Sequence, residues 1–242
     1  ISILFIFLFS SAFFQAQIDS INLIRPAAIT AVTSDERAPF THSDFDAEDL
    51  NKRDAAQDLP FLLRFAPSVV VTSDAGNGIG YTGMRIRGTD ASRVNVTING
   101  VPLNDAESQG VYWVDLPDLG ASVSGLQIQR GVGTSTVGAG AFGASVAVNT
   151  LGAIVKPGVR AVLGMGSFNS SRESVSWNTG MIGNGFSFDG RASHVSSDGY
   201  IDRASSELNS LYTSIAKRWL SGRMSFTTML GNERTYQAWY GV

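Results

Sequence analysis

Cysteine is absent from the 242 residues of this chain, and histidine occurs only twice. The lack of cysteine excludes disulfide bonds and every metal or redox site that needs a thiolate. Charged residues make up only 16% of the sequence, and the formal net charge of −3 gives no basic footprint for nucleic acid. Low charge combined with 43% apolar residues excludes a disordered chain. The 26 glycines are typical of a membrane-associated protein rich in strands and turns.

The N-terminal segment has the character of an export signal. Residues 1–17 carry no charge, and the first ionisable side chain is Asp19. The apolar run from Ile1 to Phe9 is shorter than the roughly 20 residues that a helix needs to cross a bilayer. Small and polar residues follow it, as in a secretory signal with a cleavage site near Ala16. We expect residues 1–16 to be a partial signal peptide whose first residues are missing; a buried core helix is the alternative.

Residues 44–152 have the mixed pattern of an α/β domain. Ser43 and Asp44 are predicted to cap a short helix that runs to Arg53, and Asp58 to cap a second helix that stops before Pro67. Asn99-Gly100 predicts a tight turn. The predicted strands of this region are Val69–Thr72, Met84–Arg87, Val94–Ile98, Leu126–Gln129 and Ser145–Asn149.

Residues 159–242 change to segments of roughly ten residues with alternating character. In one of them Phe186 and Phe188 share a face, and Asp189 and Arg191 lie on the other. The alternation fits strands with lipid outside and a polar lumen, or equally well a soluble antiparallel sheet. About five such strands cannot close a barrel, for which about eight is the practical minimum. We therefore expect antiparallel transmembrane strands of an incomplete β-barrel, in the front part of a longer protein.

The candidate catalytic and cofactor motifs lack the sequence context that their chemistry requires. Gly138–Gly143 matches the G-x-G-x-x-G dinucleotide fingerprint, but a strand-like run follows it and no acidic residue occurs before Glu173. His42 and His194 lie in different regions without ligand spacing around them, so a zinc site is unsupported. No nucleophile and base can be paired. We therefore expect no enzyme, no cofactor and no metal.

Three arginines lie on strands that otherwise look buried. A spacing of two puts Arg85 and Arg87 on one strand face, and Arg130 ends a later strand. Arginine is almost never buried without a partner. We expect these side chains either to lie on an exposed edge or to pair with carboxylates of another structural unit, such as a surrounding barrel.

Several motifs follow one another in a fixed order between residues 67 and 150. An R-x-R-G strand (Arg85–Gly88) is followed by the strand that ends at Asn99-Gly100, a Pro-containing helix start, a strand ending in Arg130-Gly131, and a Gly-rich stretch leading into the strand that contains Asn149. This order resembles the plug domain of TonB-dependent outer-membrane receptors. Residues 159–242 then stand where that family has its barrel, so the resemblance extends from Ile29 to the end.

The resemblance implies how the parts are used. A plug of residues 44–152 would fill a barrel in the cell outer membrane, and the plug and the extension of residues 17–43 would face the periplasm. A segment similar to a TonB box would bind the TonB-type energy-transducing protein of the inner membrane by strand addition. This segment consists of Ile29, Thr30, Ala31, Val32 and Thr33.

The resemblance also implies roles for individual side chains. Arg85, Arg87 and Arg130 would form plug–barrel contacts. The outward plug loops would be residues 73–83, 89–92 and 104–113. The candidate substrate contacts in them are Tyr81, Gln109, Tyr112 and Trp113, for each of which packing against the barrel wall is the alternative.

The implied function is energised uptake of a scarce nutrient through a barrel surrounded by outer-membrane lipid. The expected substrate is a small molecule or metal chelate, with a ferric siderophore favoured over cobalamin or an oligosaccharide. Two alternatives of another class are a secreted β-rich binding module and a passive porin, and a folded plug argues against the porin.

Overall fold

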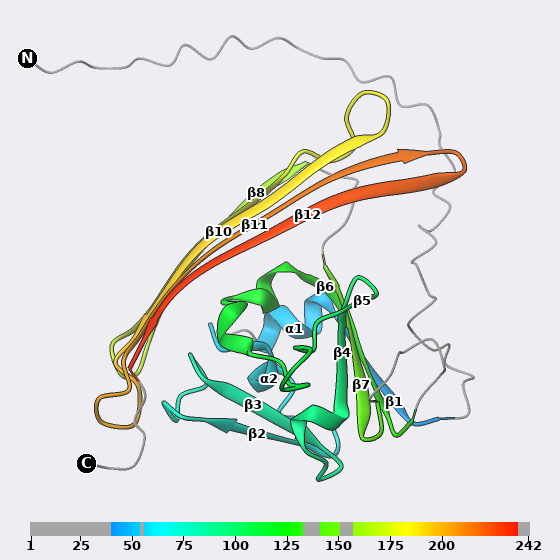
Figure 1. The fold of residues 1–242 in the computed structure, drawn as a ribbon. Helices are drawn as coiled ribbons and strands as arrows, with labels where there is room; N and C mark the ends of the chain where they lie inside the picture. Colours follow the sequence, from blue (N-terminus) through cyan, green and yellow to red (C-terminus); the bar gives the residue numbers. More distant parts are fainter. Residues whose placement is uncertain (1–39, 54–55, 133–140, 151–156, 237–242) are drawn as a thin grey trace, which may run out of the picture. The chain divides into compact units, whose positions relative to one another are not determined.

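The computed structural model describes residues 40–53, 56–132, 141–150 and 157–236. These residues form an α/β domain and, after it, a sheet of long strands that we call the strand sheet (Figure 1). Among the helices of the described residues, none combines the length and the apolar character needed to span a membrane.

The α/β domain is built on a five-stranded sheet with the order β1-β6-β7-β4-β5. Its neighbouring strands pair antiparallel except β4 and β7, which are parallel. The strands of this sheet are β1 (His42–Asp46), β4 (Val94–Ile98), β5 (Val101–Pro102), β6 (Val123–Arg130) and β7 (Ala144–Thr150). A separate hairpin consists of β2 (Val69–Ser73) and β3 (Thr82–Ile86). The helices are α1 (Ala47–Arg53), α2 (Leu59–Leu62) and the 3-10 turns η1 (Ala91–Arg93), η2 (Trp113–Asp115) and η3 (Leu119–Ser122).

One apolar core holds these elements together. It lies where the two helices and the hairpin meet the sheet, and its most deeply buried members include Leu62 of α2, Ile86 of β3 and Ile128 of β6. Each buried side chain of this size stabilises the fold by about 1.5–3 kcal/mol. The core therefore fixes the hairpin and both helices onto one face of the sheet.

The structure confirms the predicted strand of residues 94–98 and the tight turn that follows it. Strand β4 has the predicted bounds, and Asn99 and Gly100 both adopt positive φ (53° and 84°), as the predicted turn between two strands requires. The predicted helix start at Ser43-Asp44 is wrong, because both residues pair with β6 in β1. The helix begins instead after Asp46, whose carboxylate accepts the backbone N–H of Asp49 at 2.7 Å.

Asp58 occupies the predicted position before the second helix, but its side chain does not cap that helix as predicted. Asp58 does precede α2, but its carboxylate makes no capping hydrogen bond, and the helix ends at Leu62, well before Pro67. The carboxylate instead accepts the hydroxyl of Thr82, 24 residues away on β3. A tertiary contact has replaced the local one.

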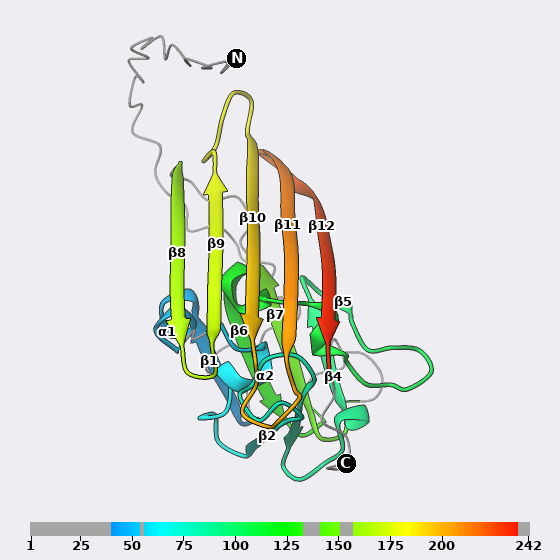
Figure 2. The ribbon, with the colours of Figure 1, turned by 90° about the vertical axis from the view of Figure 1, so that its left-hand side faces the viewer.

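The strand sheet is an antiparallel meander with the order β12-β11-β10-β9-β8 (Figure 2). Its strands are β8 (Gly158–Gly166), β9 (Ser170–Asn178), β10 (Phe186–Ser197), β11 (Ser206–Trp219) and β12 (Gly222–Thr235). In the described residues β8 and β12 do not pair with each other, so the sheet is open, as expected for the first strands of a barrel.

The strand sheet has its polarity reversed relative to a soluble sheet. On β10, Phe186 and Phe188 are 37% and 39% exposed, whereas Asp189 and Arg191 are only 5% and 4% exposed. The pattern continues across the register, since Phe188 faces Ile215 and Ile215 faces Phe226, all of them exposed. A soluble antiparallel sheet buries its apolar face. The arrangement with apolar side chains outside and polar ones inside is therefore the one the structure favours.

Candidate functional site

The α/β domain and the strand sheet meet at a buried carboxylate. Asp118 stands before η3 with φ +55°, and its side chain is 2% exposed. One carboxylate oxygen lies 2.6 Å from Nη2 of Arg172 on β9, and the other lies 2.9 Å from Nη1 of Arg191 on β10. Both guanidinium groups are buried too, so the three charges form a closed ionic cluster on the polar face of the strand sheet.

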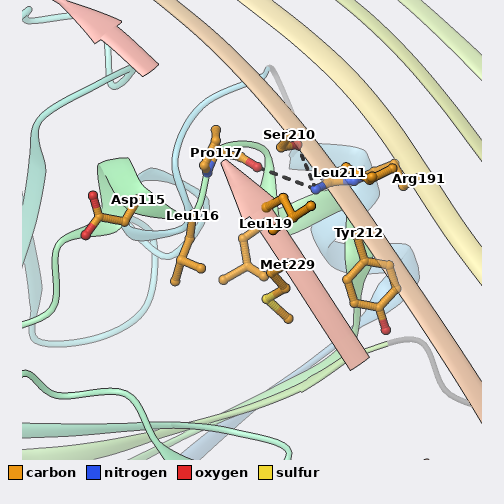
Figure 3. Close-up of a pocket in the computed structure, with 10 residues that line it drawn as sticks. Asp115, Leu116, Pro117, Leu119, Arg191, Ser210, Leu211, Tyr212 and Met229 are labelled. Carbon is orange, nitrogen blue, oxygen red and sulfur yellow. Dashed lines mark hydrogen bonds between the residues drawn. The ribbon is translucent and has the colours of Figure 1, made fainter. Parts of the chain in front are cut away.

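Arg191 extends this cluster to a third strand. Its Nη2 donates to the hydroxyl of Ser210 on β11 at 3.1 Å and to the carbonyl of Pro117 at 3.5 Å (Figure 3). Beside it lies a cavity of about 20 Å³, lined also by Asp115, Tyr212 and Met229. That volume accommodates about one water molecule. The cavity lies in the contact region between the α/β domain and the strand sheet, which we call the joint. It is too small for a cargo molecule.

Further polar contacts join the α/β domain to the strand sheet along its length. Tyr212 of β11 donates its hydroxyl to Thr150 at 3.1 Å. Toward the ends of β10 and β11, Asn77 donates to the hydroxyl of Ser197 at 2.7 Å, and the backbone N–H of Tyr200 donates to the carbonyl of Ala75. Ionic and hydrogen-bonded contacts are thus spread along the joint.

A small apolar cluster completes the joint. Ile79 and Val114 of the α/β domain pack with Val195 and Leu208 of the strand sheet, and Tyr81 packs against them while remaining partly exposed. This contact brings the loop of residues 73–83 next to Val114, which follows the loop of residues 104–113. The loop of residues 89–92 does not join them, because it follows the opposite end of the β2–β3 hairpin.

The four predicted substrate contacts differ in accessibility. Tyr112 is 52% exposed, and Gln109 is exposed in a loop where it adopts φ +59°. Tyr81 is partly buried in the apolar cluster just described. Trp113 is only 4% exposed and belongs to the core of the α/β domain. Tyr112 and Gln109 are therefore the two of these four whose side chains are exposed.

The loop that carries Gln109 and Tyr112 is held by Asn104. Its amide oxygen accepts the N–H of Val96, and its amide nitrogen donates to the carbonyls of Val94 and Gln109. Asp105 adds a turn by accepting the backbone N–H of Ser108 at 2.7 Å. These bonds fix the loop to β4.

The three predicted plug–barrel arginines fall into two places. Arg85 is exposed on β3, but β3 ends at Ile86 and Arg87 has φ +55°, so the strand face predicted to carry both does not reach Arg87. Arg87 donates to the hydroxyl of Thr41 at 2.8 Å. Arg130 is 8% exposed and donates to the carbonyl of Pro67 and to the hydroxyl of Ser43.

Arg87 and Arg130 thus lie together against the segment that leads into β1. Burial and the neighbouring positive charge of Arg87 lower the pKa of Arg130. Their pairing with barrel carboxylates stays a prediction. The predicted TonB-box residues 29–33 and the predicted signal segment lie outside the described residues.

Sequence reasoning missed Asp118, Arg172 and Arg191. Asp118 lies in a Pro-containing stretch that resembles an ordinary turn, and its partners are far away in the sequence. The one usable signal was the placement of Arg191 on the polar side of an alternating strand. In the described ranges no group of three or more His, Cys, Asp and Glu side chains is arranged to hold a metal ion.

Comparison with known families decides what the α/β domain is. Residues 34–145 match the family model described as the TonB-dependent receptor plug domain. The chain carries the plug domain of the TonB-dependent receptors. The plug therefore accounts for the α/β domain, and β8–β12 follow it as the first strands of an incomplete barrel.

Solved structures share the fold of the plug and the strands together. The siderophore receptor PirA from Acinetobacter baumannii matches with a TM-score of 0.60 and 16% identity over 80% of this chain and 32% of its own. The ferric-catecholate import receptor Fiu from E. coli K12 matches with 0.66 and 18%, over 82% and 28%. The copper transporter OprC matches with 0.67 and 16%, over 81% and 32%.

At these identities the likeness is one of fold, and the chain spans about a third of the length of the solved structures. No curated protein matches the chain. The family model that matches residues 34–145 is that of a receptor domain.

Proposed function

We propose that the full-length protein is an outer-membrane receptor for energised, TonB-coupled uptake. The observation that carries the proposal is the reversed polarity of the strand sheet beside a plug domain. Apolar side chains such as Phe188 and Phe226 would face outer-membrane lipid. Buried Asp189 and Arg191 would line a lumen that the plug fills.

The proposed cargo is a ferric siderophore or a similar metal chelate. Solved structures of this fold include one receptor named for siderophores and one named for ferric catecholate, which supports that choice. A copper transporter shares the fold as well, so the fold alone does not select the cargo. Cobalamin and oligosaccharides are the alternative cargoes. Tyr112 and Gln109 are the proposed contacts because they are exposed on a loop that Asn104 holds in place.

The proposed energy source is a TonB-type protein of the inner membrane that pairs with residues 29–33. A β-branched run near a terminus is suited to strand addition, in which the main chain supplies the hydrogen bonds. The plug and the N-terminal extension would then face the periplasm, and the barrel would sit in the outer membrane.

The decisive experiment expresses the full-length gene and follows both location and transport. We expect the protein in the outer-membrane fraction and uptake of radiolabelled ferric siderophores that stops when the TonB-type protein is deleted. Recovery as a soluble secreted protein would contradict the proposal and favour a binding module. Transport that persists without the TonB-type protein would favour a passive porin. Energised uptake of cobalamin or an oligosaccharide alone would keep the receptor and change its cargo.

A further inference from the structure

Asp58 is an acidic residue of the plug that is buried and has no ion pair with a cation among the described residues. Asp58 is 3% exposed and lies directly before α2. Its backbone N–H donates to the carbonyl of Gly78 at 2.9 Å, and its Oδ2 accepts the hydroxyl of Thr82 at 2.8 Å. Both partners belong to the loop of residues 73–83 or its end. The carboxyl group therefore fastens that loop to the start of α2.

The charges that act on Asp58 are negative. They are those of Glu233 on β12 and Asp118. Asp118 is itself paired with Arg172 and Arg191, which offset its charge, and Arg64 donates to the side chain of Gln57. Among the described residues, no Lys or Arg forms an ion pair with Asp58.

A carboxylate in such a place is costly, and protonation removes the cost. Burial raises the pKa of Asp58 to about 8, against the opposing hydrogen bond from Thr82 and with added repulsion from Glu233 and Asp118. An acid of that strength is mostly neutral at neutral pH. Its protonation state then depends on whether the loop and β12 remain packed around it.

The cover of Asp58 is also part of the joint. The loop that binds it reaches the strand sheet through Asn77 and Ser197 and through the backbone of Ala75 and Tyr200. A movement of this loop away from both the strand ends and the start of α2 would break the contact with Thr82 and admit water. Separation of the plug from β12 would at the same time move Glu233 away from Asp58 and so weaken its repulsion of the ionised carboxylate.

We propose that Asp58 is a proton-binding site of the plug, occupied while the plug is seated and emptied when the loop of residues 73–83 lifts. In the release step the O–H bond of the carboxylic acid breaks, its electron pair stays on the carboxylate, and the proton passes to water. The proposal rests on the proposed function only in requiring that the plug moves. Because displacement releases the proton of Asp58, plug displacement becomes easier as the pH rises.

The sign follows from linkage. Below the ordinary pKa of an aspartate both the folded and the unfolded chain are protonated, and the site contributes no pH dependence. Between the ordinary pKa of an aspartate and about 8, the folded plug holds a proton that the unfolded chain has lost. The free energy of unfolding therefore falls as the pH rises, with a slope set by a difference of up to about one bound proton between the two states. Above that pH both states are ionised and the dependence ends.

Infrared spectroscopy of the purified full-length receptor tests the site without cargo or TonB. We expect a carbonyl band of a protonated carboxyl group that titrates away near pH 8 and is missing in Asp58→Asn. The matched control Asp202→Asn, an exposed acid of the β10–β11 loop, should keep the band. Absence of any band that depends on Asp58 overturns the proposal and leaves the receptor function untouched.

A second variant keeps the test independent of the Asp58 side chain. Thr82→Val removes the hydrogen bond that favours the ionised form, so the band should persist to higher pH. An unchanged titration midpoint would overturn the assigned geometry.

The release step has its own test, a disulfide formed by Asn77→Cys with Ser197→Cys, which holds the loop to the strand end. At neutral pH, urea that loosens the plug should abolish the band in the reduced protein and spare it in the oxidised one. Equal loss in both forms overturns the coupling to the loop.

Discussion

Asp118 of the plug and Arg172 of β9 lie 2.6 Å apart, carboxylate oxygen to guanidinium nitrogen, with both side chains almost completely buried. Arg191 of β10 closes the cluster from the neighbouring strand. This ionic cluster is separate from the plug arginines for which the sequence predicts barrel acids, and its charges are arranged the other way round. In this cluster the plug supplies the acid and the strands supply the cations.

Removal of this acid should loosen the plug. Asp118→Ala leaves two buried guanidinium groups without their counter-charge, and breaking a buried pair in this way costs about 3–5 kcal/mol. We expect the plug of the full-length receptor to unfold at lower denaturant concentration, and cells to become more sensitive to large antibiotics. The measurements are denaturant unfolding followed by tryptophan fluorescence, and antibiotic susceptibility.

The control for Asp118 is Asp202→Ala, which removes an exposed acid from the β10–β11 loop and should leave both measurements unchanged. Equal unfolding midpoints for Asp118→Ala and the unmodified receptor would show that the cluster contributes no anchoring.

Sequence patterns predicted what depends on neighbours in the chain. The alternation on β10 and the Asn99-Gly100 turn are properties of a few consecutive residues, and both are confirmed. Asp118 could not be identified, because its importance arises only when β9 and β10 bring Arg172 and Arg191 to it. Asp58 was misassigned for the same reason, since Thr82 lies on another element and outcompetes the local cap.

The outward face of β12 offers a test of the lipid contact. Phe226→Arg introduces a charge into the middle of the exposed apolar band, where a cation on the lipid face costs about 2–4 kcal/mol. We expect less folded receptor in the outer membrane, measured by the heat-modifiable mobility of the barrel on gels. Asn232→Arg puts the same residue on the same face of the same strand, near its end, and should assemble normally. Equal assembly of the two variants would contradict a lipid-facing surface.

The coupling segment makes a different prediction, which rests on the sequence alone. Proline at Thr30 or Val32 removes a backbone donor that strand addition to the TonB-type protein would use. Energised uptake should be lost while cargo binding at the cell surface is retained, as measured with labelled cargo at low temperature and at growth temperature. Ser20→Pro, outside the segment, should transport normally. Normal uptake by both proline variants would show that the segment lies elsewhere.

Arg87 and Arg130 provide the last prediction, because two neighbouring cations lie against the segment that enters β1. Arg130 is buried and, among the described residues, donates only to a carbonyl and a hydroxyl oxygen. We therefore predict that carboxylates of the complete barrel neutralise the pair. Arg87→Ala would then leave such a carboxylate without its partner, and should increase antibiotic leakage and impair energised uptake while the barrel still assembles. Arg93→Ala removes an exposed arginine from η1 and serves as the control, with no expected effect. If Arg87→Ala matches this control in permeability and uptake, the hydroxyl of Thr41 and solvent are sufficient partners for Arg87, and no barrel carboxylate needs it.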